Sequence, residues 1–261
     1  MTASVLIERK GAIGFLTLNR PEAGNAINLD LARGLRDAVD DVAADPNVRC
    51  IVLRGGGRMF CVGGDVKALE AAGRDRPQLL GAILAALHPA IDCLARMDKP
   101  LITAVHGPAA GAGLGLAVVG DIVLAEPAAH FTMAYSAVGL TPDGGTSWLL
   151  PRLVGLRRAQ ELALTNRRVP AAEAAAMGLV TRLVAEGTLC AEVSALAENL
   201  ANGPSRALAG TRRLLFAAGL TSLTEMLAAE REQIVRQGAT AESFEGLRAF
   251  VERRKPDFHC E

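Results

Sequence analysis

Apolar residues at the start of the chain follow two different periods. Short apolar segments at 5–8 and Ile13–Leu18 flank Lys10-Gly11, which predicts two strands joined as a hairpin. Apolar residues then recur at steps of three and four. This pattern predicts a helix with one buried face, capped by Asn28 and ended by Asp45-Pro46. The apolar positions of that helix are Leu31, Leu35, Val39 and Val42.

Three unbroken apolar runs predict strands that are covered on both faces of a sheet: 50–53, Leu101–Val105 and Ile122–Ala125. A helical stretch over 78–97 separates the first two runs, and a glycine-rich turn followed by a helix to Val119 separates the others. The repeated order of strand, helix and strand predicts right-handed parallel crossovers, and therefore an α/β fold.

Helix signals dominate the second part of the chain, from about Thr146 onward. The last stretch, 205–252, has little strand character. We therefore predict a core over residues 1–200 and a helical C-terminal extension over residues 201–261.

Composition narrows the class of protein. Lys plus Arg and Asp plus Glu both total 28, so no net charge recruits nucleic acid or an anionic membrane. The first residues lack a signal-like apolar segment, and Gly, Pro or charge interrupts the longer apolar stretches, which predicts neither export nor a membrane span. Five scattered cysteines show no metal-site spacing, so we predict free thiols, no metal, and a cytoplasmic protein.

Two glycine-rich segments, 59–65 (MFCVGGD) and 105–115 (VHGPAAGAGLG), each follow a predicted strand and precede a helix. Main-chain N–H groups in such turns can converge on one anionic atom. The second segment resembles a dinucleotide loop only partly, because the final glycine spacing and the later acidic residue are missing. A further alternative is that its glycines serve only close helix packing.

Several further motifs stand in a characteristic order. They are 19–26 (NRPEAGNA), 142–145 (PDGG), Arg168 followed by 171–175 (AAEAA), 178–180 (GLV) and the tail 250–258 (FVERRKPDF). From about residue 5 to residue 258 the chain resembles the enoyl-CoA hydratase/isomerase (crotonase) superfamily. The resemblance implies a spiral of ββα units, followed by a helical trimerisation region. It also implies a homotrimer or a dimer of trimers.

The resemblance implies an oxyanion hole formed by the main-chain N–H groups of Gly64 and Ala112. Removing a proton next to a thioester places negative charge on the carbonyl oxygen, and two preorganised donors stabilise that charge. Coenzyme A is expected as part of an acyl-CoA substrate, with no tightly bound cofactor. Lys255 and Phe258 match tail residues that contact the nucleotide, sometimes from a neighbouring subunit. The other implied contacts are Gly24, Ala26, Val62, Gly64, Asp65 and Val66.

The sequence departs from the hydratases of this superfamily at both acid–base positions. Gly115 and Tyr135 stand where those enzymes have two glutamates. Asp143 remains, in the PDGG motif, and resembles the single base of the double-bond isomerases, including the ring-opening isomerases of phenylacetate degradation. A base of this kind can move one proton from C2 to C4. The alternative for Asp143 is a turn residue that caps the next helix.

Other side chains and functions stay open at this stage. Asp121 and His106 are interpreted as structural, whereas Tyr135 and Trp148 are candidates for lining the acyl pocket. In place of an isomerase, the chain could be hydratase-like, or a hydrolase in which Asp143 acts as base or nucleophile. It could also be an acyl-CoA binding subunit without catalytic activity.

Overall fold

The computed structural model describes residues 3–259. Its main sheet has six strands in the order β1-β2-β3-β4-β6-β9. The first pair is an antiparallel hairpin and all other pairs are parallel, which confirms the predicted parallel direction of the crossovers. The strands are β1 (Val5–Lys10), β2 (Ile13–Leu18), β3 (Cys50–Gly55), β4 (Leu101–Val105), β6 (Ile122–Ala125) and β9 (Arg182–Leu183).

A second, three-stranded sheet lies beside the first in the order β5-β7-β8, and the sequence patterns did not predict it. Its strands are only two or three residues long, too short to show a period. They are β5 (Ala109–Ala110), β7 (His130–Thr132) and β8 (Val169–Pro170). The two sheets and the helices between their strands agree with the spiral of ββα units that the sequence analysis expects.

The first helix begins where the sequence predicts, because the Asn28 side chain accepts a hydrogen bond from Leu31 N–H at 2.9 Å. The helices are α1 (Leu29–Ala44), α2 (Val66–Ala71), α3 (Arg76–Arg96), α4 (Ala112–Val118), α5 (Thr146–Val154), α6 (Leu156–Thr165), α7 (Ala171–Ala176), α8 (Leu189–Ala201), α9 (Ser205–Ala218), α10 (Leu223–Gly238) and α11 (Ala241–Glu252).

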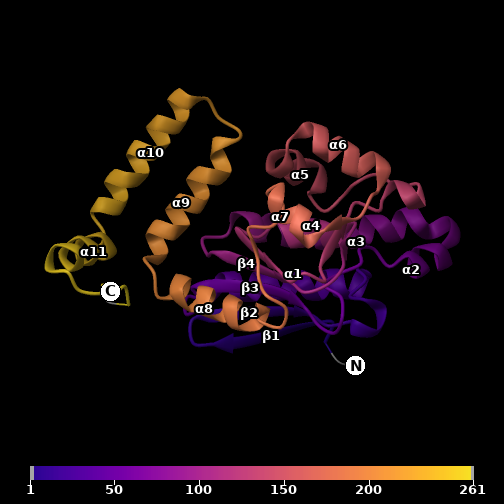
Figure 1. Ribbon diagram of the computed structural model, residues 1–261, viewed down its shortest axis with the longest axis horizontal. Helices are drawn as coiled ribbons and strands as arrows, with labels where there is room; N and C mark the ends of the chain where they lie inside the picture. The colour runs from indigo at the N-terminus through magenta and orange to yellow at the C-terminus, as the bar shows by residue number, and fades with distance from the viewer. Residues whose placement is uncertain (1–2, 260–261) are drawn as a thin grey trace.

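Both faces of the main sheet are covered, as the unbroken apolar strands predicted. Ile51 and Leu53 belong to the larger core with α1 and α3, whereas Cys50 and Val52 alternate to the opposite face and pack with α8. Beyond α8 the chain leaves the sheet. Figure 1 shows α9, α10 and α11 extending to one side of the spiral, with the C-terminus beside them.

Within residues 3–259, one helix is long and apolar enough to cross a membrane, by length and composition alone. It spans Gly73–Arg96 and includes α3, and its most apolar window has a mean hydropathy of 1.5, with 28% of that window buried. The sequence analysis predicted no membrane span because Gly, Pro or charge interrupts the longer apolar stretches. This helix passes the test of length and composition despite such interruptions. Leu87, Ile91 and Leu94 of this helix pack into the main core, so we assign it to the folded spiral.

The cysteines within the described residues are free thiols. Burial raises the pKa of the Cys50 and Cys61 thiols to about 12, so both stay protonated and act as small apolar side chains. Cys260 lies outside the described residues.

Candidate active site

The two glycine-rich segments pack directly against each other. Ala110 N–H donates to the Cys61 carbonyl at 2.9 Å, and Cys61 N–H donates to the Pro108 carbonyl at 3.1 Å. A Cβ atom on Gly113 would lie 2.2 Å from the Cys61 oxygen, and one on Gly63 would lie 2.7 Å from the Ala110 oxygen. The close packing proposed as an alternative is therefore real, and it brings the two segments together.

Two main-chain N–H groups stay unpaired where these segments meet. Among residues 3–259, the N–H groups of Gly64 and Ala112 donate to no protein acceptor. Ala112 opens α4, so its N–H belongs to the first helical turn, where partners inside the helix are missing. Gly64 and Ala112 both line one cavity. The two glycine-rich segments therefore pack closely and also leave two main-chain N–H groups available as donors.

A buried asparagine that the sequence analysis missed holds the first of these segments. Asn25 is fully buried, with a positive φ of 57°. Its side-chain amide donates to the carbonyls of Met59 and Gly56 at 2.8 and 2.9 Å. Its position in the NRPEAGNA motif was visible, but only the tertiary contacts reveal that it fixes the segment that carries Gly64.

Asp143 lies on the same cavity as the two unpaired amides. Within the described part of the chain, Asp143 and Tyr135 supply the only polar side chains of its lining, and Tyr135 Oη donates to Asp143 Oδ1 at 2.7 Å. The rest is apolar or glycine, with side chains that include Ile27, Leu80, Ile83, Leu84, Val138 and Leu140.

The interpretation of Asp143 as a helix cap is wrong. The N-cap of α5 is Gly145, in a left-handed conformation and without a side-chain cap. The Asp143 main-chain carbonyl accepts from Thr146 N–H and Thr146 Oγ1, at 3.1 and 2.8 Å. The carboxylate is thereby left free of the helix and accepts from Tyr135 instead.

Gly115 and Tyr135, the two positions that the sequence analysis compared with hydratase glutamates, differ in the space they offer. A Cβ atom on Gly115 would lie 2.5 Å from the Gly144 oxygen, so no larger side chain fits there without displacing main chain. Tyr135 is buried and points its hydroxyl at Asp143. The cavity therefore holds one carboxylate where a two-glutamate site would hold a pair.

Three of the six implied coenzyme A contacts near the N-terminus line the same cavity, whereas Gly24, Ala26 and Asp65 do not. Val62, Gly64 and Val66 line it, and the Asp65 side chain caps α2 while pairing with Arg20 at 3.1 Å. Arg20 also donates to the Ala26 carbonyl at 2.5 Å. Gly24 is left-handed at φ 62°, and a Cβ atom there would lie 2.9 Å from the Met59 sulfur. One set of contacts thus fixes this segment beside the cavity.

The two tail residues are not part of that arrangement within a single chain. The carbonyl of Phe258 accepts from Arg49 at 3.1 Å, and its ring lies against Gly246 of α11. Figure 1 shows the C-terminus and α2 at opposite sides of the molecule. Contacts from Lys255 and Phe258 to a nucleotide at this cavity would therefore have to come from a neighbouring subunit, and they stay a prediction.

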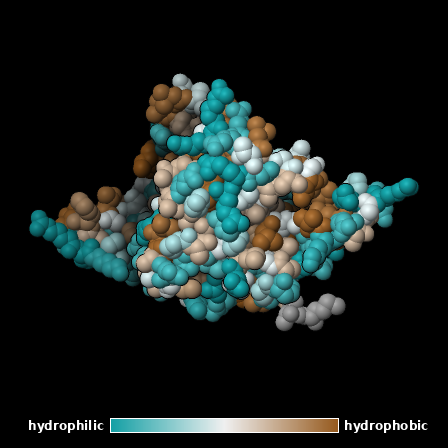
Figure 2. Space-filling model, turned by 45° about the vertical axis from the view of Figure 1, so that its right-hand side comes forward, coloured by the Kyte–Doolittle hydropathy of each residue, from teal (hydrophilic) through white to brown (hydrophobic). Residues whose placement is uncertain are grey.

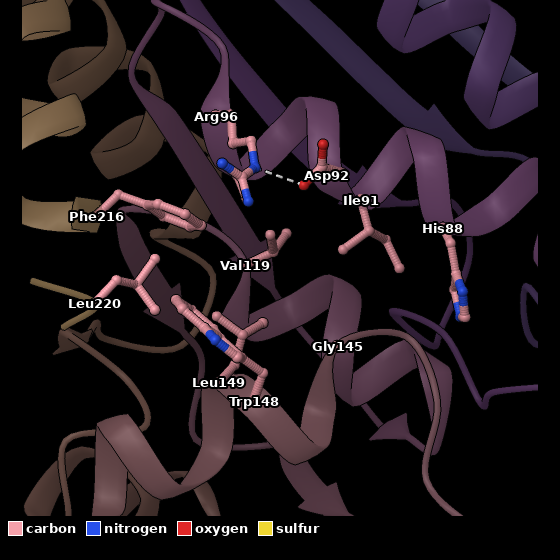
Figure 3. A pocket seen from close by; sticks show the side chains of 11 residues that line it. His88, Ile91, Asp92, Arg96, Val119, Gly145, Trp148, Leu149, Phe216 and Leu220 are labelled. Atoms are coloured by element: carbon pink, nitrogen blue, oxygen red, sulfur yellow. Dashed lines mark hydrogen bonds and ion pairs between the residues drawn. The ribbon is translucent and has the colours of Figure 1, made fainter.

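Trp148 lines a different pocket from Asp143. Its ring stacks on Phe216 of α9 with ring centroids 5.1 Å apart, and Arg96 lies over the Phe216 ring (Figure 3). Arg152 lies over the Trp148 ring. His88 of α3 also lines this pocket, and its Nε2 accepts from Gly144 N–H at 3.4 Å. Of the two aromatic residues proposed for the acyl pocket, only Tyr135 faces Asp143.

Asp121 and His106 make the structural contacts that the sequence analysis expects. Asp121 accepts from Leu101 N–H at 2.7 Å and pairs with Arg212 of α9 at 2.7 Å. His106 contacts the Gly57 carbonyl through Nε2 at 3.0 Å. Both side chains hold loops at strand ends rather than facing the cavity.

The spiral fold and this cavity define a crotonase-fold enzyme. The family model for enoyl-CoA hydratase/isomerase matches residues 8–261. The chain therefore belongs to the enoyl-CoA hydratase/isomerase family.

Curated relatives and solved structures agree with this assignment. The chain is 38% identical to a 1,2-epoxyphenylacetyl-CoA isomerase of Escherichia coli, over 93% of each chain. It is 36% identical to a Rhodobacter capsulatus protein named "Probable enoyl-CoA hydratase", over 98% of this chain and 97% of the relative. An enoyl-CoA hydratase structure from Polaromonas sp. JS666 superimposes with a TM-score of 0.93 at 35% identity, covering 97% of this chain and 98% of that one.

Proposed function

We propose that this protein isomerises a carbon–carbon double bond of an enoyl-CoA, with Asp143 as the proton shuttle. The observation that carries the proposal is that Asp143 is the one carboxylate among the described residues that line the cavity, where it lies with the Tyr135 hydroxyl and two main-chain amides without a protein acceptor. Adding water across a double bond requires a group to activate the water as well as a proton donor. Moving a double bond requires only one group that takes and returns a proton.

The proposed reaction begins when a 3-enoyl-CoA places its thioester oxygen between the N–H groups of Gly64 and Ala112. Asp143 then removes a proton from C2, and the electron pair moves onto the thioester oxygen as an enolate. The two amides stabilise that charge. Asp143 returns the proton to C4, which leaves the double bond between C2 and C3. Coenzyme A takes part only as the thioester portion of the substrate.

Two further features support this proposal. The backbone of Gly144 occupies the space beside Gly115, so a second acid is excluded from that position by packing. The E. coli relative is itself named as an isomerase of an acyl-CoA, although other relatives of similar identity are named as hydratases. The names alone do not separate the two activities, whereas the cavity favours one-base chemistry.

The decisive variant is Asp143→Asn, which keeps the size of the side chain but removes the base. We expect conversion of a 3-enoyl-CoA to its 2-enoyl isomer to fall at least about 100-fold, because a positioned acid or base contributes at least that factor. Coenzyme A binding, measured by calorimetry, should persist. Full isomerase activity in the variant would contradict the proposal.

The same protein should be assayed on a panel of enoyl-CoA substrates, with isomerisation and hydration measured separately. A higher rate of hydration than of isomerisation would favour the hydratase-like alternative. Label from heavy-oxygen water entering Asp143 would favour a nucleophilic hydrolase. Absence of C2 proton exchange in a bound acyl-CoA would favour a binding subunit without catalytic activity.

A further inference from the structure

Tyr135 makes the only side-chain contact to the Asp143 carboxylate within residues 3–259. Its hydroxyl donates to Asp143 Oδ1 at 2.7 Å and lies 3.2 Å from the Asp143 main-chain carbonyl. The ring also lies beside the other half of the site, because a Cβ atom on Gly111 would be 4.0 Å from Tyr135 Cζ. Tyr135 therefore touches both the carboxylate and the turn that carries Ala112.

The backbone holds Tyr135 in this position through a strained turn. Ala134 adopts a left-handed conformation with φ 61°, which is costly for a residue with a Cβ atom. Tyr135 N–H donates back to the Met133 carbonyl at 2.8 Å, and the Tyr135 carbonyl accepts from Leu140 N–H at 3.1 Å. The turn directs the side chain into the cavity, where it is 8% exposed.

The hydroxyl acts as a donor over the whole working range of pH. Burial, and then the charge of Asp143, raise the pKa of Tyr135 above its usual value. A phenol that stays protonated keeps its hydrogen bond to the carboxylate oxygen. His88 of α3 also lies close to this loop and accepts from Gly144 N–H.

We propose that Tyr135 is a positioning residue for Asp143, a role that rests on the proposed function. By donating to Oδ1, the phenol fixes the plane of the carboxylate and leaves Oδ2 as the atom that takes the substrate proton. The chain thus uses a hydroxyl at a position that the sequence analysis compared with a glutamate of the hydratases.

The first test compares Tyr135→Phe with Thr146→Val. Each variant removes one hydroxyl next to Asp143. The Thr146 hydroxyl donates to the Asp143 main-chain carbonyl and interacts with the Tyr135 hydroxyl, but it makes no hydrogen bond to the carboxylate. In Tyr135→Phe we expect kcat to fall about 10- to 100-fold with KM unchanged, the loss expected for one hydrogen bond to a charged group. Thr146→Val should leave both constants close to the wild-type values.

A second measurement needs no substitution at Tyr135, so it stays informative if Tyr135→Phe does not fold. Tyr135 is the only tyrosine in the chain, so the near-ultraviolet absorbance of tyrosinate reports on this residue alone. The charge of Asp143 opposes ionisation of the phenol, so Asp143→Asn should ionise Tyr135 at lower pH than the wild type. If the variant ionises no earlier than the wild type over the alkaline range in which both stay folded, the positioning role is overturned.

The outcomes separate this proposal from the proposed function. If Asp143→Asn keeps full isomerase activity, the function itself fails. If that variant is inactive while Tyr135→Phe retains the wild-type kcat, only the positioning role fails. An equal fall in kcat in Thr146→Val would mean that Tyr135 acts only by supporting the loop, which also overturns the role.

Discussion

The spiral core and the three C-terminal helices bury their apolar side chains to different extents. In the spiral, Leu16, Ile51, Leu53 and other large residues are fully buried by strands and helices of the same chain. In α9, α10 and α11, large apolar residues stay exposed, among them Phe250 at 84%. Figure 2 shows apolar surface on the part that projects from the main body, where Figure 1 places these helices.

The exposed residues follow helical spacing, so they form faces rather than scattered positions. Leu223, Leu227 and Ile234 share one side of α10. On α11 the corresponding residues are Phe244, Leu247 and Val251. Apolar faces of this kind mark sites of association. The spiral thus buries its core within one chain, whereas we expect other copies of the chain to cover the apolar faces of the C-terminal helices.

The largest effect is expected where the spiral is packed most closely. Gly113→Ala would place a Cβ atom 2.2 Å from the Cys61 oxygen, so we expect a loss of about 3 kcal/mol in the free energy of unfolding. Gly81→Ala is the matched control, since it lies in α3 with nothing within 4 Å of the added atom. The control should stabilise the protein by about 0.5–1 kcal/mol. Denaturant unfolding measures both variants, and equal effects would contradict the packing argument.

The next effect, expected for Ala112→Pro, is on kcat rather than on the free energy of unfolding. Ala112 is the first residue of α4, a position where helices accept proline, but proline has no N–H group. We expect kcat to fall about 100- to 1,000-fold, as when one oxyanion donor is lost. Ala112→Ser keeps the N–H group and serves as the control. If both variants have the same kcat, the Ala112 amide does not act on the substrate.

Substitutions in the C-terminal helices are expected to change the assembly and to have the smallest effect on kcat. Leu223→Asp should lower the mass measured by light scattering, because it places a charge on an apolar face that we expect to be buried in a trimer. Leu164→Asp is the control, because Leu164 is 79% exposed against 76% for Leu223 but lies on α6 of the spiral. If neither variant changes the mass, this face does not hold the assembly together.

Much of the spiral could be predicted from local patterns. The bounds of β2, β4 and β6, and the cap at Asn28, agree with the apolar runs and the capping signal. The second sheet could not be predicted, because strands of two or three residues carry no period. The division at residue 200 stays a prediction. Helix α8 ends at Ala201, and its apolar side chains still pack on the main sheet.

The site was predictable in its main-chain parts and less so in its side chains. Gly64, Ala112 and Asp143 were singled out from motifs, and the structure brings them to one cavity. The contact of Tyr135 with Asp143 was not foreseen, because it joins two irregular loops in which sequence spacing does not fix direction. For the same reason the position of Trp148 in a separate pocket was not foreseen.

By itself, the sequence determined the parallel strands and the two glycine-rich turns, because periodicity and glycine placement act over a few neighbouring residues. The spiral and the candidate base Asp143 followed from the resemblance of its motifs to the family. Only the tertiary structure decided which groups meet. It placed the Gly144 backbone against Gly115 and the Tyr135 hydroxyl on Asp143. Distances between loops depend on the packing of the whole core, and no local pattern encodes them.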